Sequence, residues 1–205
     1  MNILVEKLED GILVKDGKPV VFYHGTNSEF EFFDKSFLGS AKNGEVYGDS
    51  FNFTAYKSRA EDFGKYIVKA FLKVRNPLVM GTNEYLVDGK ELNSYTDLST
   101  RPVMLKILRK LWIGDMNNSS QDDYLISKLR SPAGFVDLLK GIAHRDKTHL
   151  SDLIKKFGFD SIVDGHIVAV FYPEQIQIIG RENSEKVTYE SLREVYVRIL
   201  KESIK

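Results

Sequence analysis

The sequence contains no cysteine, which excludes disulfide bonds, thiolate metal sites and cysteine nucleophiles. It has no excess of either charge, because 29 Lys and Arg residues balance 29 Asp and Glu residues. This balance argues against a general electrostatic role on nucleic acids or membrane surfaces. No apolar run is long enough to span a bilayer, and the N-terminus lacks a basic segment followed by an apolar one. We therefore expect a soluble, cytoplasmic protein that does not act at a membrane.

Several common catalytic motifs are also missing. The chain has no Gly-x-Ser-x-Gly elbow, no Walker loop and no dinucleotide-binding Gly-x-Gly-x-x-Gly. His144 and His149 are five residues apart, not four as in a helical two-histidine site, and no carboxylate pattern accompanies them. We therefore expect no metal site.

The remaining pattern predicts an α+β protein. A length of 205 residues fits one domain, 1–205, with a sizeable insertion. The insertion, about 81–157, has the apolar periodicity of helices, with Gly158 placed to end the last one. Alternating or continuous apolar runs predict strands elsewhere, and an amphipathic helix closes the chain. These elements are a hairpin within 2–26, strands at 51–54, 66–74, 160–163, 167–171 and 175–179, and a helix at 188–203.

Two local patterns predict where a buried strand ends and where a short helix begins. Val20–Tyr23 is β-branched or aromatic, as a buried strand requires, and we expect His24 to stand at the end of this strand. Gly25 follows and would let a ligand approach the backbone. Further on, Ser58 and Glu61 have the spacing of a capping box, which predicts a short helix with Ser58 as its N-cap.

A set of short fragments occurs in a characteristic order. They are Tyr23-His24-Gly25-Thr26, Phe33-Asp34-Lys35-Ser36, Gly48-Asp49-Ser50-Phe51-Asn52-Phe53-Thr54, Ala60-Glu61-Asp62-Phe63-Gly64, Asn76-Pro77-Leu78, Gly158-Phe159-Asp160-Ser161-Ile162 and Phe171-Tyr172-Pro173-Glu174-Gln175-Ile176. Together they resemble the ADP-ribosyltransferase fold in its diphtheria-toxin and poly-ADP-ribose-polymerase branch, and in particular the domains of phage and mobile-element polyvalent proteins. The resemblance covers roughly 20–80 and 158–180. It implies a split, strongly bent antiparallel β core that holds NAD in a cleft, with a helical insertion and a C-terminal helix.

The resemblance also implies roles for individual residues. His24 would hydrogen-bond the adenosine ribose, the backbone of Gly25 would hold the nicotinamide carboxamide, and Thr26 would support the turn. Further positions implied to contact NAD are Ser50, Phe51, Asn52 and Phe63.

Two positions depart from the family pattern. Asn52 stands where the family has a tyrosine that stacks on nicotinamide, and Ile167 stands where it has a glutamate. Family members with isoleucine there resemble transferases that attach single ADP-ribose units. The site that we expect is therefore His24, Asn52 and Ile167, with Glu174 as a candidate to replace the missing carboxylate and NAD as the substrate.

Three functions remain open at this point. The first is a mono-ADP-ribosyltransferase, of phage or mobile-element origin, that acts in the host cytoplasm on a protein target, with a nucleic-acid target not excluded. The second is a catalytically inactive relative that binds NAD, ADP-ribose or a partner. The third is an unrelated α+β interaction protein. The sequence does not indicate an oligomeric state.

Overall fold

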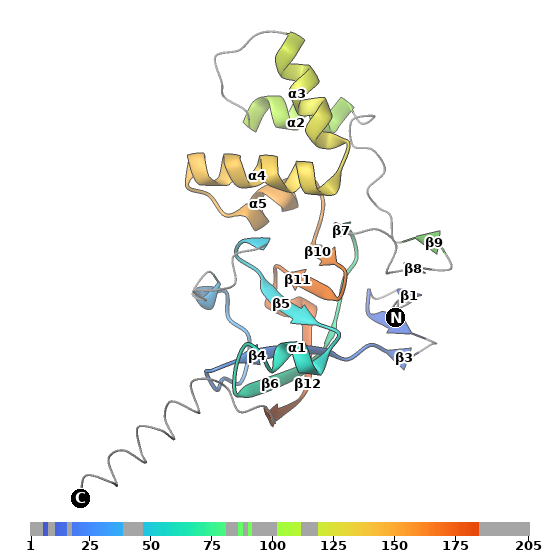
Figure 1. Ribbon diagram of the computed structural model, residues 1–205, viewed down its shortest axis with the longest axis vertical. Coiled ribbons are helices and arrows are strands. Elements are labelled where there is room, and N and C mark those ends of the chain that lie inside the picture. The colour runs from blue at the N-terminus through green and yellow to red at the C-terminus, as the bar shows by residue number, and fades with distance from the viewer. Residues whose placement is uncertain are drawn as a thin grey trace, which may run out of the picture.

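The computed structural model describes residues 6–7, 11–15, 18–38, 47–80, 86–87, 90–91, 102–111 and 119–184. Among these residues, seven strands form one sheet in the order β12-β6-β4-β5-β11-β10-β7 (Figure 1). Their bounds are β4 (Phe22–Thr26), β5 (Phe51–Thr54), β6 (Tyr66–Leu72), β7 (Pro77–Val79), β10 (Ser161–Asp164), β11 (Ile167–Val170) and β12 (Ile176–Asn183).

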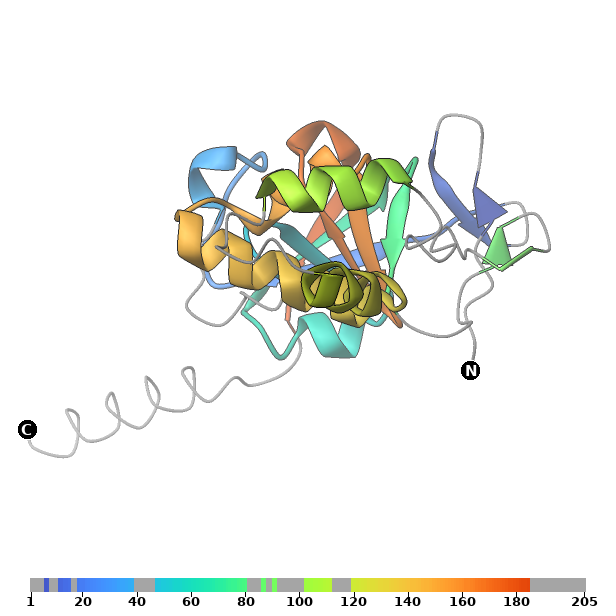
Figure 2. The same cartoon turned by 90° about the horizontal axis from the view of Figure 1, so that it is seen from above.

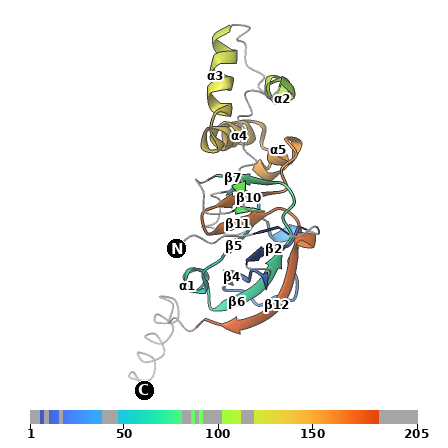
Figure 3. The ribbon, with the colours of Figure 1, turned by 90° about the vertical axis from the view of Figure 1, so that its right-hand side faces the viewer.

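The sheet is split between β4 and β5. These two strands share the single pair Tyr23–Thr54, whereas β4 pairs with β6 over five residues and β5 pairs with β11 over four. Neighbouring strands are antiparallel except β10 and β7, which are parallel. In Figure 3, β4, β6 and β12 lie at one end and β7, β10 and β11 lie toward the helices. This arrangement confirms the predicted α+β class with a split, mainly antiparallel sheet.

The helices predicted between 103 and 157 are present and lie together beyond β7 and β10 (Figures 1 and 3). Ser131 begins the longest one by accepting a hydrogen bond from the Gly134 amide at 3.1 Å. Gly158 follows the last one with a φ of +86°, as predicted for its C′ position. The four helices are α2 (Pro102–Leu111), α3 (Ser119–Leu129), α4 (Pro132–Asp146) and α5 (Leu150–Lys156).

Two buried apolar clusters lie on opposite faces of the sheet. Ala169 belongs to the cluster that packs against the helices, whereas Val168 and Val170 belong to the cluster on the other face. Successive strand residues point to opposite faces, so both faces of β11 are covered. This explains the continuous apolar run at 167–171 and confirms its interpretation as a strand buried on both sides.

The N-terminal strands form a separate small sheet. β1 (Glu6–Lys7), β2 (Leu13–Lys15) and β3 (Lys18–Pro19) are antiparallel neighbours, which confirms the predicted hairpin. In Figure 2 these dark blue strands lie at one flank of the molecule beside the green hairpin of β8 (Leu86–Val87) and β9 (Lys90–Glu91). The C-terminal helix predicted at 188–203 lies outside the described residues.

The capping box predicted at Ser58 is wrong. The short helix α1 (Lys57–Ala60) begins two residues earlier than predicted, so Ser58 lies inside it, and its N-cap Tyr56 makes no side-chain capping bond. The hydroxyl of Thr54 accepts a hydrogen bond from the Tyr56 amide at 3.1 Å, and this turn at the end of β5 sets the start of the helix. Two 3₁₀ turns complete the described elements, η1 (Lys35–Phe37) and η4 (Pro173–Gln175).

Candidate functional site

His24 joins the two halves of the split sheet. Its ring Nδ1 donates to the backbone carbonyl of Asn52 at 2.8 Å, which bridges β4 and β5 where their backbone pairing has ended. Three phenylalanine rings surround the imidazole, with centroid distances of 5.2 Å to Phe33, 5.4 Å to Phe53 and 6.3 Å to Phe30. The prediction that His24 stands at a strand end is wrong, because β4 continues to Thr26 through pairing with β6.

The environment of His24 favours its neutral form. Burial lowers the pKa of His24, and the hydrogen bond to the Asn52 carbonyl opposes this shift only in part. In a neutral imidazole whose Nδ1 carries the proton, Nε2 is an acceptor. The ring therefore has a fixed orientation and one acceptor nitrogen for a hydroxyl group.

The lowered pKa predicts a stability that depends on pH. As pH falls below 6.5, the ordinary pKa of histidine, the His24 ring of the unfolded chain becomes protonated. The same ring in the folded chain, whose pKa is lower, stays neutral over this range. The free energy of unfolding should therefore fall as pH decreases through that value, and His24→Asn should make the fall shallower. Urea unfolding at several pH values measures this. The exposed His144→Asn should leave the slope unchanged, and equal slopes for wild type and His24→Asn would contradict the prediction.

Gly25 lies directly under α1. A Cβ added at this position would stand 1.8 Å from the carbonyl oxygen of Ala60 and 3.2 Å from the Cβ of Phe63. Gly64 makes the same kind of close approach to the backbone of Thr26. The two glycines thus allow α1 and the turn after it to pack closely against the end of β4. This packing places the side chain of Phe63, which is 64% exposed, beside Gly25.

Asn52 and Ile167 lie on neighbouring strands and share one face of the sheet. Asn52 pairs with Ala169, and Ile167 pairs with Thr54, so the two side chains are diagonal neighbours. Because Thr54 also pairs with Tyr23, Gly25 belongs to this same face. The structure therefore gathers Gly25, Phe63, Asn52 and Ile167 at the split, while the His24 ring lies with Phe53 on the opposite face.

Of the other predicted site residues, Thr26, Ser50 and Phe51 lie near the split and Glu174 does not. The hydroxyl of Thr26 accepts from the Ser28 amide at 3.1 Å and so stabilises the turn after β4. Ser50 donates to the side-chain oxygen of Asn52 at 3.2 Å, and Phe51 packs in the core against Phe33. Glu174 is exposed in η4, beyond the end of β11 opposite to Ile167, so the structure does not bring it to this group.

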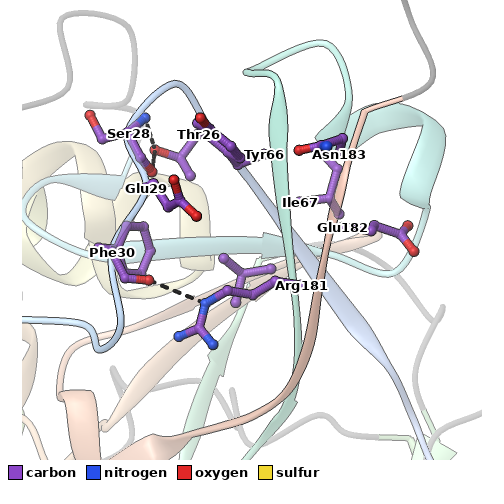
Figure 4. Close-up of a pocket in the computed structure, with 10 residues that line it drawn as sticks. Thr26, Ser28, Glu29, Phe30, Tyr66, Ile67, Arg181, Glu182 and Asn183 are labelled. Carbon is purple, nitrogen blue, oxygen red and sulfur yellow. Dashed lines mark hydrogen bonds between the residues drawn. The ribbon is translucent and has the colours of Figure 1, made fainter.

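A pocket of about 230 Å³ opens beside the end of β4 (Figure 4). Thr26, Ser28 and Phe30 line it from one side, and Tyr66 and Arg181 line it from β6 and β12. Val68, the cross-strand partner of both His24 and Arg181, is also part of the lining, so the pocket lies on the face that holds the imidazole.

Arg181 fixes the outer wall of this pocket. Its Nε donates to the carbonyl oxygen of Phe30 at 3.2 Å, and an Nη donates to that of Glu31 (Figure 4 shows the first bond). A guanidinium has five N–H donors, so this group can also bind an anion. Sequence reasoning missed Arg181, since only the pairing of β12 with β6 brings it to the loop after β4.

Within the part of the chain that the structure describes, no group of three or more His, Asp and Glu side chains is arranged to hold a metal ion. None of the helices described there is long and apolar enough to cross a membrane.

A split sheet with a histidine-glycine strand at its junction is consistent with an ADP-ribosyltransferase. A family model described as "ADP-Ribosyltransferase in polyvalent proteins" matches residues 15–186, and the chain belongs to this family. The family uses NAD as its substrate. No curated protein and no solved structure matches the chain.

Proposed function

We propose that this chain transfers a single ADP-ribose unit from NAD to a protein, with release of nicotinamide, in the manner of the histidine-tyrosine-glutamate branch of the family. The observation that carries this proposal is the bond from His24 to the Asn52 carbonyl at the split of the sheet. It orients a histidine with one acceptor nitrogen on one face of the sheet, while Gly25 and the exposed ring of Phe63 lie at the same split on the other face.

Each part of NAD has a matching feature in this proposal. The nicotinamide ring stacks on Phe63, and the backbone of Gly25 holds its carboxamide. The His24 Nε2 accepts a hydrogen bond from a ribose hydroxyl. The pocket at Thr26 and Arg181 takes the phosphates, because the guanidinium offers N–H donors there. Glu29 and Glu182 also line this pocket, and the Glu182 carboxylate is paired with Lys57 and Lys69.

The chemistry is substitution at the ribose C1′. Positive charge develops on the sugar as nicotinamide leaves, and the protein contributes positioning and electrostatic stabilisation. Ile167 replaces the glutamate that the family resemblance associates with chain elongation, and this favours one transfer over many.

The proposed target is a protein. Phe32 and Phe37, in the segment that follows β4, are 68% and 67% exposed, and aromatic side chains of this kind are enriched where proteins bind one another. The formal net charge of zero gives no general attraction to nucleic acid. We propose that the protein acts in the cytoplasm of a cell that hosts a phage or mobile element.

A catalytically inactive, NAD-binding relative is the second candidate. The presence of Asn52 and Ile167, at positions where the family has a tyrosine and a glutamate, favours it.

Incubation with labelled NAD and a host lysate separates these functions. We expect label on the protein or on a lysate component, reduced about 100-fold in His24→Ala, which removes an oriented acceptor from the site. His144→Ala, exposed on α4, is the matched control and should keep full activity. Saturable NAD binding without label would favour the inactive relative. A folded protein that binds neither NAD nor ADP-ribose would exclude both functions.

A further inference from the structure

Three residues form one row across the strands next to the split. Ile167 of β11 pairs with Asp164 of β10 on one side and with Thr54 of β5 on the other. Directly paired residues point to the same face, with Cβ atoms about 5 Å apart. Asp164 therefore lies on the strand next to Ile167, the position where the family has its glutamate, and its side chain points to the same face.

Tyr47 holds this carboxylate. Its hydroxyl donates to Oδ2 of Asp164 at 2.5 Å, and its ring is only 6% exposed in the cluster beneath the helices. Burial raises the pKa of Tyr47, and the bond to Asp164 and the negative charge of Asp164 raise it further. The phenol thus stays protonated and remains a hydrogen-bond donor.

The segment that carries Tyr47 is itself clamped. Gly48, at a φ of +72°, packs so closely on α5 that a Cβ there would lie 2.8 Å from the Cβ of Leu150. The next residue, Asp49, pairs with His149 at the start of α5. The contacts of Gly48 and Asp49 with α5 therefore hold the backbone next to Tyr47 in place, and this orients the Tyr47 hydroxyl toward Asp164.

We propose that Asp164, positioned by Tyr47, supplies the carboxylate for ADP-ribosyl transfer in place of the glutamate that Ile167 replaces. This inference rests on the proposed function and deepens it, because it names the residue that restores the missing charge.

Other carboxylates near the split are less suited to this role. Asp49 is paired with His149, and Glu61 is 7% exposed and paired with Lys57. Glu182 is paired with both Lys57 and Lys69 in the other half of the sheet. The lysine partners offset the charge of Glu61 and Glu182, and His149 occupies Oδ2 of Asp49, whereas the partner of Asp164 is a hydroxyl that carries no positive charge.

The step balances without a further reactant. The bond between C1′ and the nicotinamide nitrogen breaks, and its electron pair leaves with nicotinamide. The carboxylate of Asp164 stabilises the positive charge on the sugar and forms no covalent bond to it. A lone pair of the acceptor atom forms the new bond to C1′, and the proton of a hydroxyl, amine or water acceptor passes to solvent.

Release of nicotinamide from NAD by the purified full chain tests this assignment. We expect Asp164→Asn to lower kcat at least ~100-fold and to change KM for NAD less than about 3-fold, because the charge acts on the transition state. The amide oxygen still accepts from Tyr47, so the fold is kept. Asp137→Asn, the same change at an exposed position of α4, should leave both constants unchanged.

Tyr47→Phe gives an independent measurement. It keeps the buried ring and removes the hydroxyl, so we expect a loss of about 10-fold in kcat with KM unchanged, the size of one charge-assisted hydrogen bond. A purely structural role would lower the melting temperature and leave kcat per folded molecule unchanged.

The most specific test transfers the carboxylate from position 164 on β10 to position 167 on β11. The double variant Asp164→Asn with Ile167→Glu should recover at least ~10-fold of the lost kcat, while Asp164→Asn with Ile167→Gln should not. Wild-type kcat in folded Asp164→Asn, or no recovery in the folded glutamate variant, would overturn the assignment. A wild-type chain that binds NAD and releases no nicotinamide would instead overturn the proposed function.

Discussion

Replacement of Gln175 by leucine should lower the free energy of unfolding by about 4 kcal/mol. The side chain of Gln175 is 8% exposed and makes four hydrogen bonds to backbone groups. Its Oε1 accepts from the amides of Phe171 and Tyr172, both at 3.0 Å. Its Nε2 donates to the carbonyls of Lys73 at 3.0 Å and Asp160 at 3.1 Å. Leucine has a similar size but leaves these groups without their partner, at about 1–3 kcal/mol for each that stays buried.

Urea unfolding measures this loss, with Gln177→Leu as the matched control. Gln177 is exposed on β12, so the same substitution there should change stability by less than about 0.5 kcal/mol. Equal stabilities for the two variants would show that water replaces the bonds of Gln175. The four bonds tie the ends of β6 and β11 to the start of β10, which explains why glutamine follows Pro173-Glu174 here.

Replacement of Gly25 by alanine should lower the free energy of unfolding by about 3 kcal/mol or more. The added Cβ would overlap the carbonyl oxygen of Ala60, which is backbone and cannot rotate away. Overpacking of this kind typically costs 1–3 kcal/mol, and this overlap lies at the severe end of the range. Relief requires α1 to move away from β4, which would also separate Phe63 from the strand. We therefore expect NAD binding to weaken even at temperatures where the variant stays folded.

Gly141→Ala provides the contrasting control. A Cβ at Gly141 meets nothing within 4 Å, and the residue lies inside α4, where alanine is favoured over glycine by roughly 1 kcal/mol. Thermal unfolding should show this variant to be more stable than wild type and Gly25→Ala to be less stable. Isothermal titration with NAD then measures binding. A Gly25→Ala variant with wild-type stability and affinity would contradict the packing of α1 on β4.

Features that depend on nearby residues were predicted well from the sequence. Strand β6 and the double-sided burial of β11 follow from apolar patterns within a few residues. The chain reversal between β2 and β3 and the left-handed Gly158 follow from turn and cap chemistry, although Lys18 and Pro19 of the predicted turn belong to strand β3. The order of the family fragments led to the ADP-ribosyltransferase class, which the family match confirms over residues 15–186.

Features that depend on strand register were not predicted. The sequence placed His24 at a strand end, but pairing with β6 extends β4 to Thr26. From the sequence we expected Glu174 to be the substitute carboxylate. Glu174 lies in η4, however, which follows the end of β11 that is far from Ile167. Asp164 is only three residues from Ile167 in the chain, yet the β10–β11 hairpin is what sets the two side by side on one face.

The sequence alone thus determined which segments become strands and helices and to which family they belong, because periodicity and turn chemistry act over a few residues. Tertiary structure decided which side chains meet. The hydrogen bond of His24 to Asn52 spans 28 residues, that of Tyr47 to Asp164 spans 117, and that of Arg181 to Phe30 spans 151. Contacts of this range arise only when the sheet registers form, since a shift of one residue turns every side chain to the opposite face.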